Sequence, residues 1–137
     1  MLEPGADPHV LFDERQNGRW FPRAILVDSE GDPIERILAS KQNFDIDKII
    51  YESEGTGGIC VDGYYCKRDL SDAVEDNLRR TIEHCDKLDL IVNVTALTGG
   101  TAGLADQIIQ RSSTNYSKIE MAVVGLFPSS KMADCVV

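Results

Sequence analysis

The feature that most constrains the fold of this chain is an apolar run that passes directly into a glycine-rich turn. Residues 90–97 read Leu-Ile-Val-Asn-Val-Thr-Ala-Leu, residues 98–103 read Thr-Gly-Gly-Thr-Ala-Gly, and a helix-compatible stretch covers residues 104–111. A buried strand, a glycine turn and a helix N-terminus together expose backbone N–H groups at the positive end of a helix dipole, an arrangement that binds anions such as phosphate. The same pattern fits a plain turn between a strand and a helix, so both interpretations stay open.

The length and charge of the chain exclude several classes of protein. Its 137 residues are enough for one domain with a modest core. The net charge of −9 argues against nonspecific nucleic-acid binding, which needs clustered Lys and Arg. No apolar stretch approaches the roughly 20 residues that span a bilayer, and the acidic N-terminus does not resemble a signal peptide. We expect a soluble cytosolic protein without nucleic-acid or membrane partners.

The residues that commonly carry catalysis or bind metal form no known pattern. The four cysteines are Cys60, Cys66, Cys85 and Cys135. Their spacing matches no zinc site, so we expect free thiols. The chain has no G-x-S-x-G motif, and its two histidines are predicted in an irregular tail (His9) and at a helix end (His84). A hydrolase therefore has little support.

Apolar runs alternate with helix-forming segments, which predicts an α/β fold. Residues 1–21 are predicted to be irregular, and the apolar run within 23–30 is typical of a strand buried on both faces. Asp32 is expected to cap a helix that has Pro33 at its first position, Glu35 as capping-box partner and its end near Ser40. Residues 48–51 are predicted to form a short strand, and residues 54–58 a second glycine-rich loop.

A long helix is predicted over residues 70–87. Its apolar face would comprise Leu70, Ala73, Val74, Leu78, Ile82 and Cys85. The spacing also predicts the ion pairs Glu75–Arg79 and Asp76–Arg80. A strand over 90–97, a helix over 103–111 and a strand over 119–127 complete the order. Such alternation predicts a mostly parallel sheet with right-handed crossovers.

Three loops are expected at one edge of this sheet. They are residues 28–30, residues 54–58 and residues 98–103, and each follows a predicted strand. Because ligands of parallel sheets bind at the carboxyl ends of the strands, the three loops would surround one site.

Four segments of the chain resemble β-tubulin. Residues 12–30 resemble the stretch that ends in PRAVLVDLEP, and residues 83–88 resemble AE-x-CDxL. Residues 97–104 resemble the signature LGGGTGSG, and residues 127–137 resemble VPSPKVSDTVV. The order and spacing of the four segments make the resemblance, which covers residues 12–137, more specific than any single glycine loop.

The resemblance implies part of a three-layer, Rossmann-like GTPase domain of the tubulin/FtsZ type, here residues 22–137 and truncated at both ends. Glu30 occupies the position of the acidic residue at the Mg²⁺–phosphate end of the family's site. Gly99, Gly100, Thr101 and Ala102 match the phosphate loop. Ala96 replaces a serine that offers a hydroxyl to the nucleotide, and Asp134 falls at a position close to the ribose. Gly55 and Gly57 match a second loop near the γ-phosphate.

Several residues depart from the family pattern. Thr98, Ala102 and Leu104 each add a Cβ where the family has glycine. If Ala102 must take a glycine-only conformation, the cost is roughly 1–2 kcal/mol. Asp62 adds negative charge in place of a lysine. We therefore expect weak nucleotide binding, with a Kd no tighter than roughly 10 µM.

The resemblance implies a structural component of the microtubule cytoskeleton in the cytoplasm, with GTP or GDP and Mg²⁺ as ligands and tubulin subunits as partners. The family's first strand, its guanine-contacting asparagines and its catalytic acid loop have no counterpart here, so we expect no GTP hydrolysis by this chain alone. A sheet without that strand would also expose an apolar edge. An alternative function is a non-enzymatic interaction protein with a tubulin fold that does not bind nucleotide.

Overall fold

The computed structural model describes residues 7–40 and 42–129. In chain order the elements are the 3-10 helix η1 (Pro8–Val10), β1 (Phe12–Glu14), β2 (Trp20–Pro22), β3 (Leu26–Asp28), α1 (Gly31–Ala39), the 3-10 helix η2 (Ile46–Lys48), β4 (Ile49–Tyr51), α2 (Cys60–Tyr65), α3 (Arg68–Glu83), β5 (Leu90–Ala96), α4 (Gly99–Asn115) and β6 (Glu120–Leu126).

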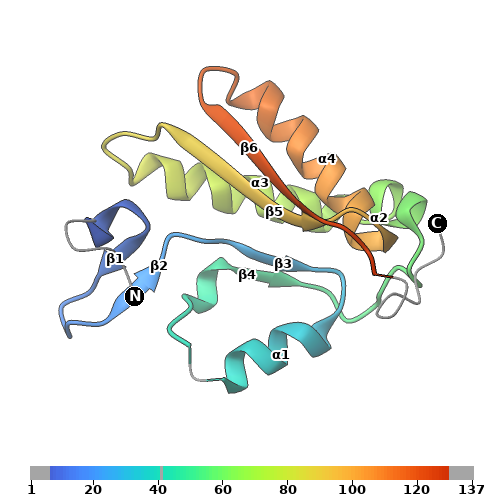
Figure 1. Cartoon of the computed structure of the whole chain (residues 1–137), viewed down its shortest axis with the longest axis horizontal. Coiled ribbons are helices and arrows are strands. Elements are labelled where there is room, and N and C mark those ends of the chain that lie inside the picture. The colour runs from blue at the N-terminus through green and yellow to red at the C-terminus, as the bar shows by residue number, and fades with distance from the viewer. Residues whose placement is uncertain (1–6, 41, 130–137) are drawn as a thin grey trace.

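The parallel strands confirm the predicted α/β fold, but they form two separate pairs. β3 pairs with β4, with Val27 opposite Ile50, and β5 pairs with β6, with Val94 opposite Val124. Within the described residues no backbone ladder joins β3 to β5. Helix α1 packs against β3 and β4, whereas α4 packs against β5, and α3 contacts both α4 and β4 (Figure 1).

The N-terminal segment is more regular than the sequence indicates. β1 and β2 form an antiparallel hairpin, with Asp13 opposite Phe21. Its turn contains Gly18 in the left-handed region (φ 71°), a conformation that glycine adopts readily. Arg23 pairs with Asp13 across the hairpin at 2.8 Å. Apolar periodicity does not indicate this short hairpin, because the segment is rich in Pro, Gly and charged residues.

Helix boundaries differ from the predicted ones in three places. α1 begins at Gly31, one residue before Asp32, and its N-cap Glu30 makes no capping bond through its side chain, so the predicted capping box is wrong. α3 spans 68–83 and ends earlier than predicted. α4 begins at Gly99, so the glycine turn forms the first turn of the helix.

The predicted face of α3 is confirmed at Leu70 and Val74, which are 3% and 5% exposed. Ala73, predicted on the same face, is exposed. Asp76 pairs with Arg80 as predicted. The predicted Glu75–Arg79 pair is wrong, because Arg79 pairs with Asp76 and Glu83 while Glu75 accepts a bond from Asn115.

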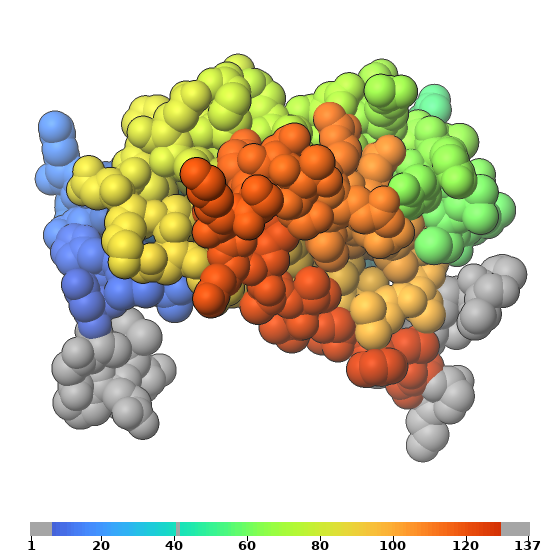
Figure 2. All heavy atoms as spheres, turned by 90° about the horizontal axis from the view of Figure 1, so that it is seen from above, coloured from blue at the N-terminus to red at the C-terminus, as the bar shows by residue number. Residues whose placement is uncertain are grey.

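Helix α2, which the sequence did not predict, crosses α4 at glycines. An ideal Cβ on Gly63 would lie 1.9 Å from the Gly100 carbonyl oxygen, and one on Gly103 would lie 1.9 Å from the Cys60 carbonyl oxygen. The backbones of the two helices are therefore in direct contact, which only glycine permits. Next to this crossing, Leu104 is 1% exposed. In Figure 2 the orange atoms of α4 adjoin the green atoms of α2 and the yellow-green atoms of α3.

The strands are less buried than predicted. In β5 the side chains of Val92 and Val94 are 51% and 66% exposed, and in β6 Leu126 is 58% exposed. The burial pattern of β5 alternates because α4 covers only one of its faces. An exposed apolar face is unusual for a parallel pair of strands, which is normally covered on both sides.

No helix in residues 7–40 and 42–129 combines the length and the apolar character needed to cross a bilayer.

Candidate functional site

All three loops that were predicted at one edge contribute residues to a common pocket. The pocket has a volume of about 250 Å³. The residues that line it are Asp28, Ser29, Glu30, Pro33, Thr56, Gly58, Thr98, Gly99, Gly100 and Thr101. The prediction that the loops after residues 23–30 and 90–97 come together is therefore confirmed.

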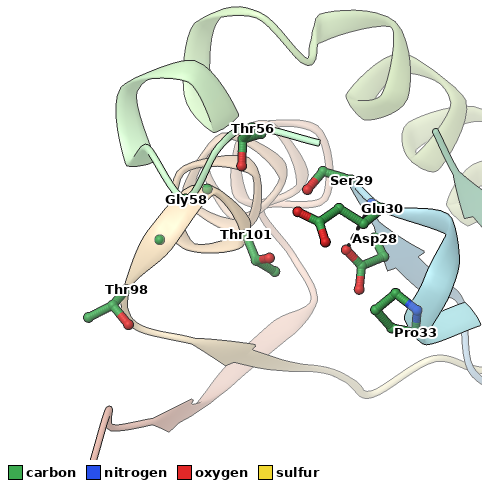
Figure 3. Close-up of a pocket in the computed structure, with 10 residues that line it drawn as sticks. Asp28, Ser29, Glu30, Pro33, Thr56, Gly58, Thr98 and Thr101 are labelled. Atoms are coloured by element: carbon green, nitrogen blue, oxygen red, sulfur yellow. Dashed lines mark hydrogen bonds between the residues drawn. The ribbon is translucent and has the colours of Figure 1, made fainter. Parts of the chain in front are cut away.

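One wall of the pocket consists of the carboxylates of Asp28, the last residue of β3, and Glu30, which follows the strand. The Asp28 carboxylate accepts a hydrogen bond from the Glu30 N–H at 3.1 Å, which is an Asx turn between the strand and α1. Burial raises the pKa of Asp28 above its usual 3.8, and hydrogen bonds from the backbone N–H groups of Glu30 and Ser29 offset part of this rise. Figure 3 shows the Glu30 carboxylate pointing into the pocket, toward Thr101.

The opposite wall is the start of α4. Gly99, Gly100 and Thr101 are its first three residues, so their N–H groups have no acceptor within the helix. Gly99 has a φ of 75°, which lets the chain turn sharply from Thr98 into the helix. The Thr101 side chain points toward the carboxylates, whereas that of Thr98 points away from them (Figure 3).

The third side of the pocket is the loop of residues 52–58. Thr56 is 6% exposed, and its Oγ1 would lie only 1.6 Å from an ideal Cβ on Gly100. Gly57 and Gly58 have φ values of 59° and 76°. Gly100 is therefore required by packing against Thr56, a role that the sequence alone does not indicate.

Only some of the predicted site residues line the pocket. Glu30, Gly99, Gly100 and Thr101 line the pocket, but Ala96 and Ala102 do not. Ala102 lies in the first turns of a right-handed helix, so the expected cost of a glycine-only conformation does not arise. Asp134 lies outside the described residues.

Six of the ten residues that line the pocket were not assigned to the site from the sequence: Asp28, Ser29, Pro33, Thr56, Gly58 and Thr98. Asp28 and Ser29 were placed at the edge of the sheet without a role in the site, and Thr56 was placed in the second glycine-rich loop, also without a role. Thr56 stands within a Gly-Thr-Gly-Gly run, and a hydroxyl residue between glycines in a loop after a strand was a signal that could have identified it.

A second hollow, of about 500 Å³, is formed by the turn between β1 and β2. Glu14, Arg15, Gln16 and Asn17 line it. It lies within a single turn and brings together no distant segments of the chain, so we do not regard it as a functional site.

The described residues contain no group of three or more His, Cys, Asp and Glu side chains arranged to hold a metal ion. The pocket offers two carboxylates, those of Asp28 and Glu30. Two oxygen ligands suit an ion such as Mg²⁺, which commonly takes one or two carboxylates and completes its shell with phosphate and water.

This geometry defines a class of α/β domain, in which a site at the carboxyl ends of parallel strands combines helix-start N–H groups with acidic side chains. The family is given by comparison with known proteins: the model of the Tubulin/FtsZ family GTPase domain matches residues 2–137. The chain therefore belongs to the tubulin/FtsZ family, as its motifs predicted.

Individual relatives are β-tubulins. A tubulin beta chain of Candida albicans is 32% identical over 132 residues, which cover 93% of this chain and 29% of that relative. The tubulin beta-3 chain of Zea mays is 33% identical over 133 residues, which cover 94% of this chain and 30% of that relative. The chain thus spans about three-tenths of the length of the curated relatives it matches.

Proposed function

We propose that this chain binds the phosphate end of a guanine nucleotide together with Mg²⁺, and that it acts as a β-tubulin-like component of the microtubule cytoskeleton in the cytoplasm, with tubulin subunits as partners. The observation that carries this proposal is the pocket itself, because it combines two carboxylates with the first N–H groups of a helix. Membership of a GTPase-domain family supports the choice of nucleotide.

The residues present fit such a ligand. The N–H groups of Gly99, Gly100 and Thr101 and the Thr101 hydroxyl would donate to phosphate oxygens. Asp28 and Glu30 would hold Mg²⁺ or its waters, and the ion would neutralise charge between carboxylates and phosphate. A volume of about 250 Å³ is below the roughly 300–1,000 Å³ of complete small-molecule sites. The pocket therefore suits the phosphates, and the proposed ribose contact of Asp134 lies outside the described residues.

Titration of the purified chain with a fluorescent GTP analogue in the presence of Mg²⁺ tests the proposal. We expect a Kd on the order of 10 µM, with displacement by GTP and GDP. Thr101→Ala is expected to weaken binding about tenfold, because one charge-assisted hydrogen bond of about 1.5 kcal/mol is lost. Ser113→Ala, at an exposed position on the same helix, is the matched control and should bind like the unmodified chain. Equal affinity of Thr101→Ala and the unmodified chain would argue that the glycine turn is only structural.

The raised pKa of Asp28 predicts a dependence on pH. The free pocket retains the Asp28 proton at a higher pH than an exposed aspartate would, whereas a cation favours the ionised form. Affinity for the Mg²⁺–nucleotide complex should therefore rise with pH through the raised pKa of Asp28 and level off above it. Comparing titrations from just above pH 3.8 up to neutral pH in the chain and in Asp28→Asn separates this effect from titration of the nucleotide.

The same shift predicts the effect of Asp28→Asn on stability. Because the folded-state pKa is raised, ionisation of Asp28 opposes folding once the pH exceeds its unfolded value. Asp28→Asn should therefore raise the melting temperature at neutral pH while it weakens Mg²⁺–nucleotide binding. A lower melting temperature would mean that the bond from the Glu30 N–H stabilises the fold more than burial of the charge destabilises it.

One observation favours the alternative of an interaction protein without nucleotide. The exposed apolar face of β5 and β6, which includes Val92, Val94 and Leu126, is a surface of the kind that other proteins cover. Absence of nucleotide binding in the titration above, together with association with tubulin, would favour this function.

A further inference from the structure

Lys67 is a buried cation beside the pocket that the proposed function does not use. Its side chain is only 9% exposed. A lysine that is buried to this extent normally has a partner. The Lys67 ammonium donates to the Glu52 carboxylate at 2.7 Å and to the carbonyl oxygen of Glu54. Lys67 lies between α2 and α3, whereas both acceptors lie just after β4. The contact therefore ties the start of α3 to the first half of the 52–58 loop.

The same loop touches the pocket on its other side. An ideal Cβ on Gly55 would lie 2.6 Å from Oε1 of Glu30, so the loop backbone packs directly on that carboxylate. Thr56 packs on Gly100, and its carbonyl oxygen accepts a bond from the Ile59 N–H at 3.1 Å. A small displacement of Gly55 or Thr56 would therefore change the contacts of Glu30 and Gly100 in the pocket.

The two glycines that follow give the loop little stiffness of its own. Gly57 and Gly58 both adopt positive φ values, and neither has an atom within 4 Å of an added Cβ. With open space beside this half of the loop, its position depends on the contacts of Glu52, Glu54, Gly55 and Thr56. Among these, the contact to Lys67 is the one that combines charge with hydrogen bonding in a buried setting.

We infer that Lys67 is a positioning residue: its bonds to Glu52 and Glu54 hold the 52–58 loop against Glu30 and Gly100, and thereby set the geometry in which the pocket meets a phosphate-bound divalent cation. The part of this inference that concerns the ligand rests on the proposed function. The part that concerns the loop does not.

A positioning role requires the ammonium group and not only the bulk of the side chain. Without it, the Glu54 carbonyl and the Glu52 carboxylate lose their donor in a partly buried place, and both would turn toward water. That movement draws the loop away from the pocket. Lys67→Met preserves the aliphatic length and removes the charge, so it isolates this effect. Glu52→Gln weakens the same contact from the other side.

Hydrogen exchange of the free protein and titration with the fluorescent GTP analogue and Mg²⁺ test the inference together. In Lys67→Met we expect amide exchange to rise about tenfold in the 52–58 loop and to stay unchanged in α4. We expect nucleotide affinity to fall at least fivefold, and Glu52→Gln to show a smaller change in the same direction. Lys87→Met is the matched control, because Lys87 pairs with Asp89 at an exposed site where the side chains are 80% and 71% exposed.

The possible results separate the inference from the proposed function. Unchanged exchange in the loop overturns the inference, and so does a uniform rise across α3 and α4, which would indicate a general role in stability. Faster loop exchange with unaltered affinity, in a chain that binds nucleotide, overturns the link to the pocket. If the unmodified chain binds no nucleotide while exchange rises only in the loop, the proposed function fails and the anchoring of the loop by Lys67 is supported.

Discussion

Gly103→Ala is expected to destabilise the fold by about 3 kcal/mol and to lower the melting temperature by roughly 10 °C. The added methyl would lie 1.9 Å from the Cys60 carbonyl oxygen and 2.9 Å from the Tyr64 backbone nitrogen. Both atoms belong to the backbone of α2, so no side-chain rotation can relieve the overlap. α2 would have to move away from α4. A loss of this size is a large fraction of the roughly 5–15 kcal/mol that stabilises a typical domain.

Thermal unfolding followed by circular dichroism measures this effect. Gly31→Ala is the matched control, since its Cβ would lie 3.4 Å from the Tyr51 ring, which is ordinary contact. That change should leave stability equal or raise it by up to about 1 kcal/mol, because alanine loses less conformational entropy than glycine in a helix. A melting temperature of Gly103→Ala close to that of the unmodified chain would contradict direct backbone contact between α2 and α4.

The glycines at the start of α4 are therefore required for two different physical reasons, and the sequence indicated only one of them. Gly99 allows a sharp turn, which local pattern predicts from a strand followed by a helix. Gly100 and Gly103 are required by Thr56 and by the α2 backbone, which are distant in sequence. A contact between distant segments leaves no periodicity along the chain, so its glycines look like any other turn residues.

The same distinction explains which elements were predicted. α3 follows from apolar residues every four positions, and β5 from a continuous apolar run. α2 has six residues, an internal glycine and no apolar period, and it is helical because it packs on α4. The parallel strands form two separate pairs. The residue pattern within a strand does not indicate which other strand lies beside it.

Within the site, two kinds of inference contributed. Glu30 and Thr101 were assigned from the resemblance to β-tubulin, and the place of their loops after apolar runs predicted that they share an edge, because the carboxyl ends of parallel strands meet there. Thr56 and Lys67 were missed because their importance arises from burial, at 6% and 8% exposure, in a segment without regular structure. Burial of polar residues in loops can be identified only once the fold is known.

Chelation of Mg²⁺ is expected to weaken binding of the GTP analogue about a hundredfold. The ten residues that line the pocket include Asp28 and Glu30 but neither lysine nor arginine, so bare phosphates would meet only negative side-chain charge. At close range in a partly buried site, like charges repel by several kcal/mol unless a cation lies between them. Titration in Mg²⁺ and in excess chelator measures the difference, and equal affinity in the two buffers would contradict it.

The variant Glu30→Gln tests whether the cation that binding requires is held at Glu30. The variant should need about ten times more Mg²⁺ for half-maximal binding, because a neutral amide is a weaker ligand than a carboxylate. Glu35→Gln, which removes an exposed carboxylate of α1 outside the pocket, should leave the Mg²⁺ requirement unchanged. If both variants shift the requirement equally, the effect comes from the net charge of −9 and not from a bound ion at Glu30.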